Sequence, residues 1–140
     1  MDFADPEVYL AVCTQFAYSW VVQRPPITVV ETGRFLRDAD RLMPESDRAD
    51  LVGLIAANPE AGDLIQETGG VRKMRWALPG RGKSGGARVV YYYHNDSLPV
   101  FLLAAYGKNE KANLSKAERN AMAKLVPTLI QNYSEGNRRK

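Results

Sequence analysis

The stretch that decides the fold is Val71-Arg72-Lys73-Met74-Arg75-Trp76-Ala77, and two similar runs follow it, ARVVYYYH over 87–94 and PVFLLAAY over 99–106. β-Branched and aromatic residues occur in all three runs, which is typical of strands. A tight turn at 95–97 joins the last two, so we predict that they form an antiparallel hairpin. A Gly-rich loop, 78–86, is expected between the first two strands.

Helical patterns lie on both sides of these strands in the chain. A short β-branched strand, Ile27–Thr32, precedes a helix over Gly33–Met43 and a second helix that Ser46 or Asp47 caps and that stops at Asn58-Pro59. The stretch 60–70 is predicted to be a connection.

A capping box at Leu114–Glu118 opens a last helix, which runs to about Asn132 with a kink at Pro127. The order of elements predicts an α+β fold. Its sheet is mostly antiparallel and four-stranded, with N-terminal helices, a C-terminal helix and all helices on one face.

The 140 residues, 45% of them hydrophobic, suit one folded domain. We expect an N-terminal extension of unknown role over 1–26, the domain proper over 27–132 and a frayed basic tail over 133–140. An acidic start argues against a secretory signal, and no run of about 18 apolar residues predicts a membrane span. The single cysteine, Cys13, fits a reducing compartment, so we expect a cytoplasmic protein without membrane association.

Charge divides the chain in two. Residues 1–70 carry five basic and twelve acidic side chains, whereas residues 71–140 carry fourteen basic and four acidic ones. A polyanion-binding face backed by an acidic half would have this distribution. A solvated basic surface without a partner would have it too.

Strand alternation sorts the basic residues. Lys73 and Arg75 are predicted to point to one side of the sheet, with Met74 and Trp76 on the other. Further cations and a tyrosine are expected to converge on the same open face, where they could hold phosphates and stack on bases. The alternative is that the cations merely protect an exposed sheet.

Other chemistries lack their motifs. Gly82-Lys83-Ser84 resembles the end of a P-loop, but Ala77 stands where the pattern needs glycine and a strand follows instead of a helix. One His and one Cys give no zinc spacing, so no metal and no cofactor are expected. His94, before a turn, is interpreted as structural or solvent-facing.

Three motifs in order carry a family resemblance: GGVRKMRW over 69–76, GRGKSGGARVVYY over 80–92, and YGKNE over 106–110 followed by Leu114-Ser115. Together they resemble the HigB-type branch of the RelE toxin family, from about Ile27 to Ile130. The resemblance implies a microbial-ribonuclease-like fold and a toxin of a type II toxin–antitoxin system. Such toxins enter the ribosomal A site and cut mRNA, without a metal, by attack of the ribose 2′-hydroxyl on the adjacent phosphate.

The resemblance also implies partners. A cognate antitoxin, expected to be a helix-turn-helix protein of the HigA type, holds the toxin inactive, and operator DNA is bound only through the antitoxin complex. The ribosome and mRNA are the targets. Some relatives place a catalytic Tyr or His after the final strand, but 109–114 contains neither here.

Transesterification needs a base, cations for the phosphorane and an acid for the leaving oxygen. Lys73 or Lys83 is the expected proton acceptor, since neighbouring cations favour a neutral lysine; a tyrosine is the alternative. The remaining roles are as follows: phosphorane stabilisation by Arg75 and Arg88, neutralisation of the leaving side by Lys108, RNA-backbone binding by Arg72, Arg81 and Lys111, and base stacking by Tyr106.

Two other functions stay open. The chain could be a non-catalytic module that binds RNA or an antitoxin. It could also be an interaction domain whose basic face meets an acidic protein.

Overall fold

A computed structural model describes residues 25–78 and 82–138, with the backbone alone for 82–85 and 135–138. In chain order the elements are β1 (Val29–Glu31), α2 (Gly33–Leu42), α3 (Glu45–Ala57), β2 (Asp63–Leu64), β3 (Val71–Leu78), β4 (Gly82–Tyr92), β5 (Val100–Gly107) and α4 (Lys116–Arg138). The strands form one sheet in the order β1-β5-β4-β3-β2, in which only the β1–β5 pair is parallel. The predicted α+β fold is confirmed.

The sheet has five strands where four were predicted. The additional strand, β2, lies in the stretch expected to be a connection and pairs Asp63 with Lys73 and Leu64 with Arg72. Two residues give no periodicity that could reveal a strand. Their pairing nevertheless fixes this segment beside β3.

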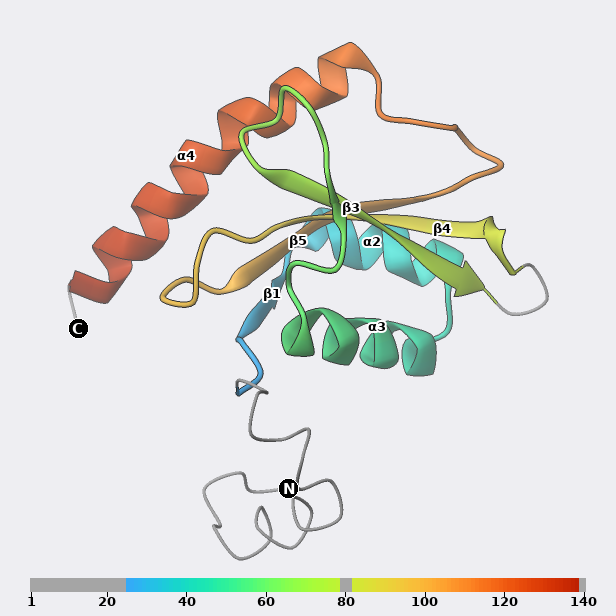
Figure 1. Cartoon of the computed structure of the whole chain (residues 1–140), viewed down its shortest axis with the longest axis horizontal. Coiled ribbons are helices and arrows are strands. Elements are labelled where there is room, and N and C mark those ends of the chain that lie inside the picture. The colour runs from blue at the N-terminus through green and yellow to red at the C-terminus, as the bar shows by residue number, and fades with distance from the viewer. Residues whose placement is uncertain (1–24, 79–81, 139–140) are drawn as a thin grey trace, which may run out of the picture.

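The helices lie on both faces of the sheet, so the prediction of a single helical face is wrong (Figure 1). One core contains residues of α2 and α3, such as Phe35 and Leu51, packed on Met74 and Leu102. The other core is covered by α4. Every residue of β5 is buried, and its continuous apolar sequence is typical of a strand covered on both sides.

The boundaries differ from the predicted ones in three places. The second helix begins at Glu45 with Pro44 as its N-cap and no side-chain cap, so neither Ser46 nor Asp47 caps it. Strand β4 begins at Gly82, which shortens the expected Gly-rich loop. Helix α4 continues past Asn132 to Arg138, with Pro127 inside it.

The predicted capping box of α4 is confirmed. The Ser115 backbone N–H donates to Glu118 Oε1 at 2.9 Å, and the Glu118 N–H donates to Ser115 Oγ at 3.1 Å. These bonds satisfy donors that the first helical turn leaves free. They also fix the end of the 108–115 segment, which leads from β5 to α4.

Strand β5 pairs with β1 over Val100–Leu102. The later part of β5, up to Gly107, lies at the edge of the sheet. The Ala105 N–H donates to Asp38 Oδ2 at 2.9 Å, and the Gly107 N–H donates to Glu110 Oε1 at 2.7 Å. Arg41 forms ion pairs with both carboxylates. Helix α2 and the 107–111 turn are therefore joined to this edge.

None of the helices in the described parts of the chain has both the length and the hydropathy of a membrane span.

Candidate active site

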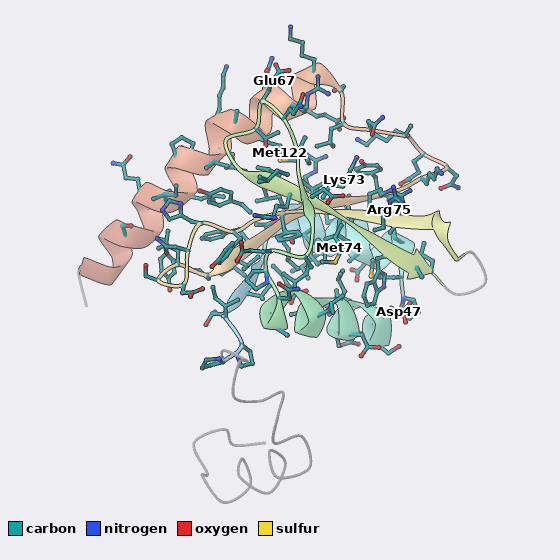
Figure 2. All side chains as sticks on the ribbon, in the orientation of Figure 1. Asp47, Glu67, Lys73, Met74, Arg75 and Met122 are labelled. Atoms are coloured by element: carbon teal, nitrogen blue, oxygen red, sulfur yellow. The ribbon has the colours of Figure 1, made fainter. Side chains whose placement is uncertain are left out.

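A cavity of about 370 Å³ opens between β2, β3, β4 and the 108–115 segment. The described residues that line it are Asp63, Leu64, Ile65, Lys73, Arg75, Arg88, Ala112 and Asn113. Three cations thus meet in one place, with Asp63 as the one carboxylate among these lining residues. Figure 2 shows Lys73 and Arg75 on β3, in the middle of the molecule.

Sheet register brings the cations together. Arg75 lies directly opposite Arg88 on β4, and Arg88 lies opposite Tyr106 on β5. Directly opposed residues of antiparallel strands project on the same face. Met74 and Trp76 pack on the α2–α3 side, which confirms the predicted alternation along β3.

The exposure of the three cations differs. The Arg75 side chain is exposed and Lys73 is half-buried, whereas Arg88 is only 6% exposed. Burial of a guanidinium between strands restricts its movement, and like charges directly opposite each other are unfavourable in a sheet. The Arg75–Arg88 pair nevertheless places two positive charges next to each other on this face of the sheet.

Lys73 has a neighbour that the sequence did not indicate. Its Nζ donates to Asn113 Oδ1 at 3.2 Å, which joins β3 to the 108–115 segment across 40 positions of the chain. This bond orients the amino group of a residue that lines the cavity. No local pattern in 109–114 could have revealed the contact, since it depends on the path of that segment over the sheet.

Tyr106 lies next to the cavity, but its ring is only 3% exposed. Lys111 Nζ lies 5.0 Å from the ring centroid and also pairs with Glu118. Burial raises the pKa of the Tyr106 hydroxyl, and the positive charge of Arg88 opposes that rise. Tyr106 belongs to the core that α4 covers, so this structure offers no exposed ring face for the predicted base stacking.

The sequence matches the model of a known protein family. The model of the family described as "RelE toxin of RelE / RelB toxin-antitoxin system" matches residues 49–137. The chain belongs to the RelE toxin family. Its function is therefore that of a toxin in a toxin–antitoxin system.

A solved structure is also similar to this RelE toxin. It is that of an arginine-to-alanine double mutant of the Escherichia coli toxin RelE in the free state. The sequence identity is 17%, the match covers 62% of this chain and 88% of that one, and the TM-score is 0.45.

The other predicted site residues of this RelE toxin lie elsewhere. Arg72 faces the α2–α3 side, where its Nη1 donates to the carbonyl oxygens of Glu60 at 3.1 Å and Gly62 at 2.8 Å. It thus supports the segment before β2. Alternation along β3 predicts that Arg72 lies on the opposite face of the sheet from Lys73. The sequence therefore already argued against the prediction that Arg72 binds RNA beside Lys73.

Lys108 is exposed and directly follows the Gly107–Ala87 pair, but it is not among the described lining residues. Arg81 lies outside the described residues, and Lys83 is described only as a backbone position of β4. His94 is exposed and its Nδ1 lies 2.8 Å from Tyr92 Oη, as expected of a solvent-facing residue. Cys13 and the expected N-terminal extension up to residue 24 also lie outside the described part.

Proposed function

We propose that this RelE toxin, a HigB-type member of the family, is an endoribonuclease that cuts mRNA in the ribosomal A site without a metal. The observation that carries the proposal is the meeting of Lys73, Arg75 and Arg88 in one cavity. Guanidinium groups bind phosphate oxygens through paired N–H donors. A half-buried lysine beside them is placed to exchange a proton with a ribose.

In the proposed reaction, Lys73 accepts the proton of the 2′-hydroxyl, with Asn113 orienting its amino group. The 2′-oxygen attacks the adjacent phosphorus, and the bond from phosphorus to the 5′-oxygen breaks. Arg75 and Arg88 stabilise the charge that develops on the phosphorane, the largest contribution that fixed donors can make. The products are a 2′,3′-cyclic phosphate and a 5′-hydroxyl.

The leaving 5′-oxygen needs a proton. Lys108 follows β5 at the end of the sheet where Arg88 lies. We therefore propose that its ammonium group neutralises the charge on the leaving oxygen and donates the proton that forms the 5′-hydroxyl. Arg81 and Lys83 are proposed to hold the RNA backbone and to assist proton transfer, respectively. Lys111 is proposed to bind the RNA backbone, as the sequence predicts.

The proposed partners are an antitoxin of the HigA type, which would block the cavity, and the ribosome with its mRNA. Binding to operator DNA would occur only in the antitoxin complex. We place this activity in the cytoplasm, where ribosomes translate.

The test is cleavage of mRNA on purified, programmed ribosomes, read by primer extension. Arg75→Ala should reduce the cutting rate by about 100-fold or more, because one fixed donor to a developing oxyanion is worth that much. Arg37→Ala is the matched control, since this exposed arginine lies on α2, on the other side of the sheet. It should cut at the wild-type rate.

Two results would contradict the proposal. If Arg75→Ala and the wild type cut at the same rate, the cavity takes no part in the reaction. No cutting by the wild-type chain, with RNA or antitoxin still bound, would favour the non-catalytic binding module.

A further inference from the structure

A second cavity, of about 330 Å³, adjoins the cationic one. The described residues that line it are Ile65, Gln66, Glu67, Lys73, Asn113, Leu114 and Arg119. Ile65, Lys73 and Asn113 line both cavities, and we refer to the two adjoining cavities together as the groove. A size of this order is within the range of small-molecule sites, roughly 300–1,000 Å³.

The chemistry changes along the groove. At the Arg75–Arg88 end it suits a phosphate. The second cavity combines the amides of Gln66 and Asn113, the carboxylate of Glu67, the cationic side chains of Lys73 and Arg119, and apolar side chains. A carboxylate repels the phosphates of RNA, so it does not serve general RNA affinity. Amides, a carboxylate and an apolar wall are the groups that recognise the edge and the face of a nucleobase.

The turn that carries Glu67 has a strained backbone. Glu67 has a φ of 66°, and within residues 25–78 and 82–138 it is the one non-glycine residue with positive φ. The fully buried Thr68 closes the turn: its Oγ1 donates to the Ile65 carbonyl at 2.6 Å and accepts from the Val71 N–H at 3.1 Å. Figure 2 places Glu67 on the outer bend of this turn, away from the sheet. Strain of this kind is more frequent at functional sites than elsewhere.

We propose that the second cavity binds the base of the nucleotide whose 2′-hydroxyl attacks, and that it prefers guanine. The proposal rests on the proposed function, because it takes Lys73 as the contact of that hydroxyl. Lys73 lines both cavities, so a ribose beside it would direct its phosphate to Arg75 and its base to Glu67.

Guanine follows from the donor pattern. The Glu67 carboxylate only accepts hydrogen bonds, and guanine alone among the four bases presents two adjacent N–H donors, N1–H and N2–H, on its pairing edge. Arg119 uses Nη1 to donate to the Leu114 carbonyl at 2.9 Å, and a guanidinium has further donors for guanine O6. Adenine would place its N1 lone pair against the carboxylate, so it would be rejected.

The test is binding of nucleoside 3′-monophosphates, which carry the base, the ribose and the phosphate that the groove would hold. The full chain is titrated with 3′-GMP and 3′-AMP, and affinities are read from NMR chemical shifts. The wild type should bind 3′-GMP about 10-fold or more tightly than 3′-AMP, in keeping with the discrimination that one bidentate contact gives.

Glu67→Gln should reduce this preference to within about threefold, because the amide offers only one acceptor oxygen. Glu45→Gln is the matched control, since it removes the same charge from a side chain that is 89% exposed on α3. It should keep the wild-type preference. Equal affinity of the wild type for both nucleotides, or an unchanged preference in Glu67→Gln, would overturn the proposal.

Cleavage assays separate this proposal from the proposed function. Ribosomal cutting without any preference for guanine 5′ to the cut would overturn the base site and leave the nuclease standing. A guanine preference in nucleotide binding without any cutting would support the base site and overturn the proposed nuclease activity.

Discussion

Removal of the Tyr91 hydroxyl from the core tests whether its hydrogen bonds hold the 59–64 segment, which contributes to the wall of the cavity. Tyr91 on β4 is fully buried; its Oη donates to the Pro59 carbonyl at 2.8 Å and accepts from the Gly62 N–H at 2.8 Å. Burial raises the pKa of this hydroxyl, so it stays protonated at neutral pH. Asp63 and Leu64 of the cavity wall follow directly in the chain.

Tyr91→Phe keeps the ring and leaves a buried N–H and a buried C=O without their partner. Each such group costs about 1–3 kcal/mol. Because relaxation of the segment can satisfy part of this loss, the free energy of unfolding should fall by about 2–4 kcal/mol. The change is measured by urea unfolding, followed by circular dichroism.

Tyr93→Phe is the matched control, because its hydroxyl donates at 2.7 Å to Asp96 in an exposed turn. It should change the free energy of unfolding by no more than about 0.5 kcal/mol. A loss below about 0.5 kcal/mol in Tyr91→Phe as well would refute the reasoning, since the 59–64 segment would then be held by other contacts.

Two further predictions concern charge. The ion pair with Lys111 and the Ser115 N–H hold the pKa of Glu118 below its ordinary value, so its contribution to stability is complete above about pH 5 and is lost as the pH falls through the lowered pKa. Unfolding midpoints measured from about pH 6 to about pH 3 should therefore fall less steeply in Glu118→Gln than in the wild type, and parallel curves would contradict this. Arg88→Met should reduce ribosomal cutting by about 100-fold, because it removes a fixed donor to the charge that develops on the phosphorane; cutting at the wild-type rate by this variant would contradict that role.

Alternation was sufficient to predict the orientation of the cations along β3. Lys73 and Arg75 project into the cavity, whereas Met74 and Trp76 pack on α2 and α3, because the pleat leaves no other arrangement once a strand forms. Three of the predicted catalytic residues therefore line one cavity. Their roles in the reaction stay predictions.

Contacts across long stretches of chain could not be predicted in this way. Asn113 meets Lys73, and Glu67 enters the neighbouring cavity, because of the paths of two loops over the sheet. These paths depend on buried contacts such as those of Thr68 and Tyr91, which no periodicity encodes. The second helical face was predictable in principle, since β5 has no polar position between Val100 and Tyr106.

The carboxylates at the outer edge of β5 have a consequence for assembly. Unpaired strand edges are templates on which other chains can extend a sheet. Here Asp38 and Glu110 occupy the N–H groups of Ala105 and Gly107, so a foreign strand would meet oxygen atoms in place of donors. Beyond β1, this margin of the sheet is thus closed to aggregation by strand addition.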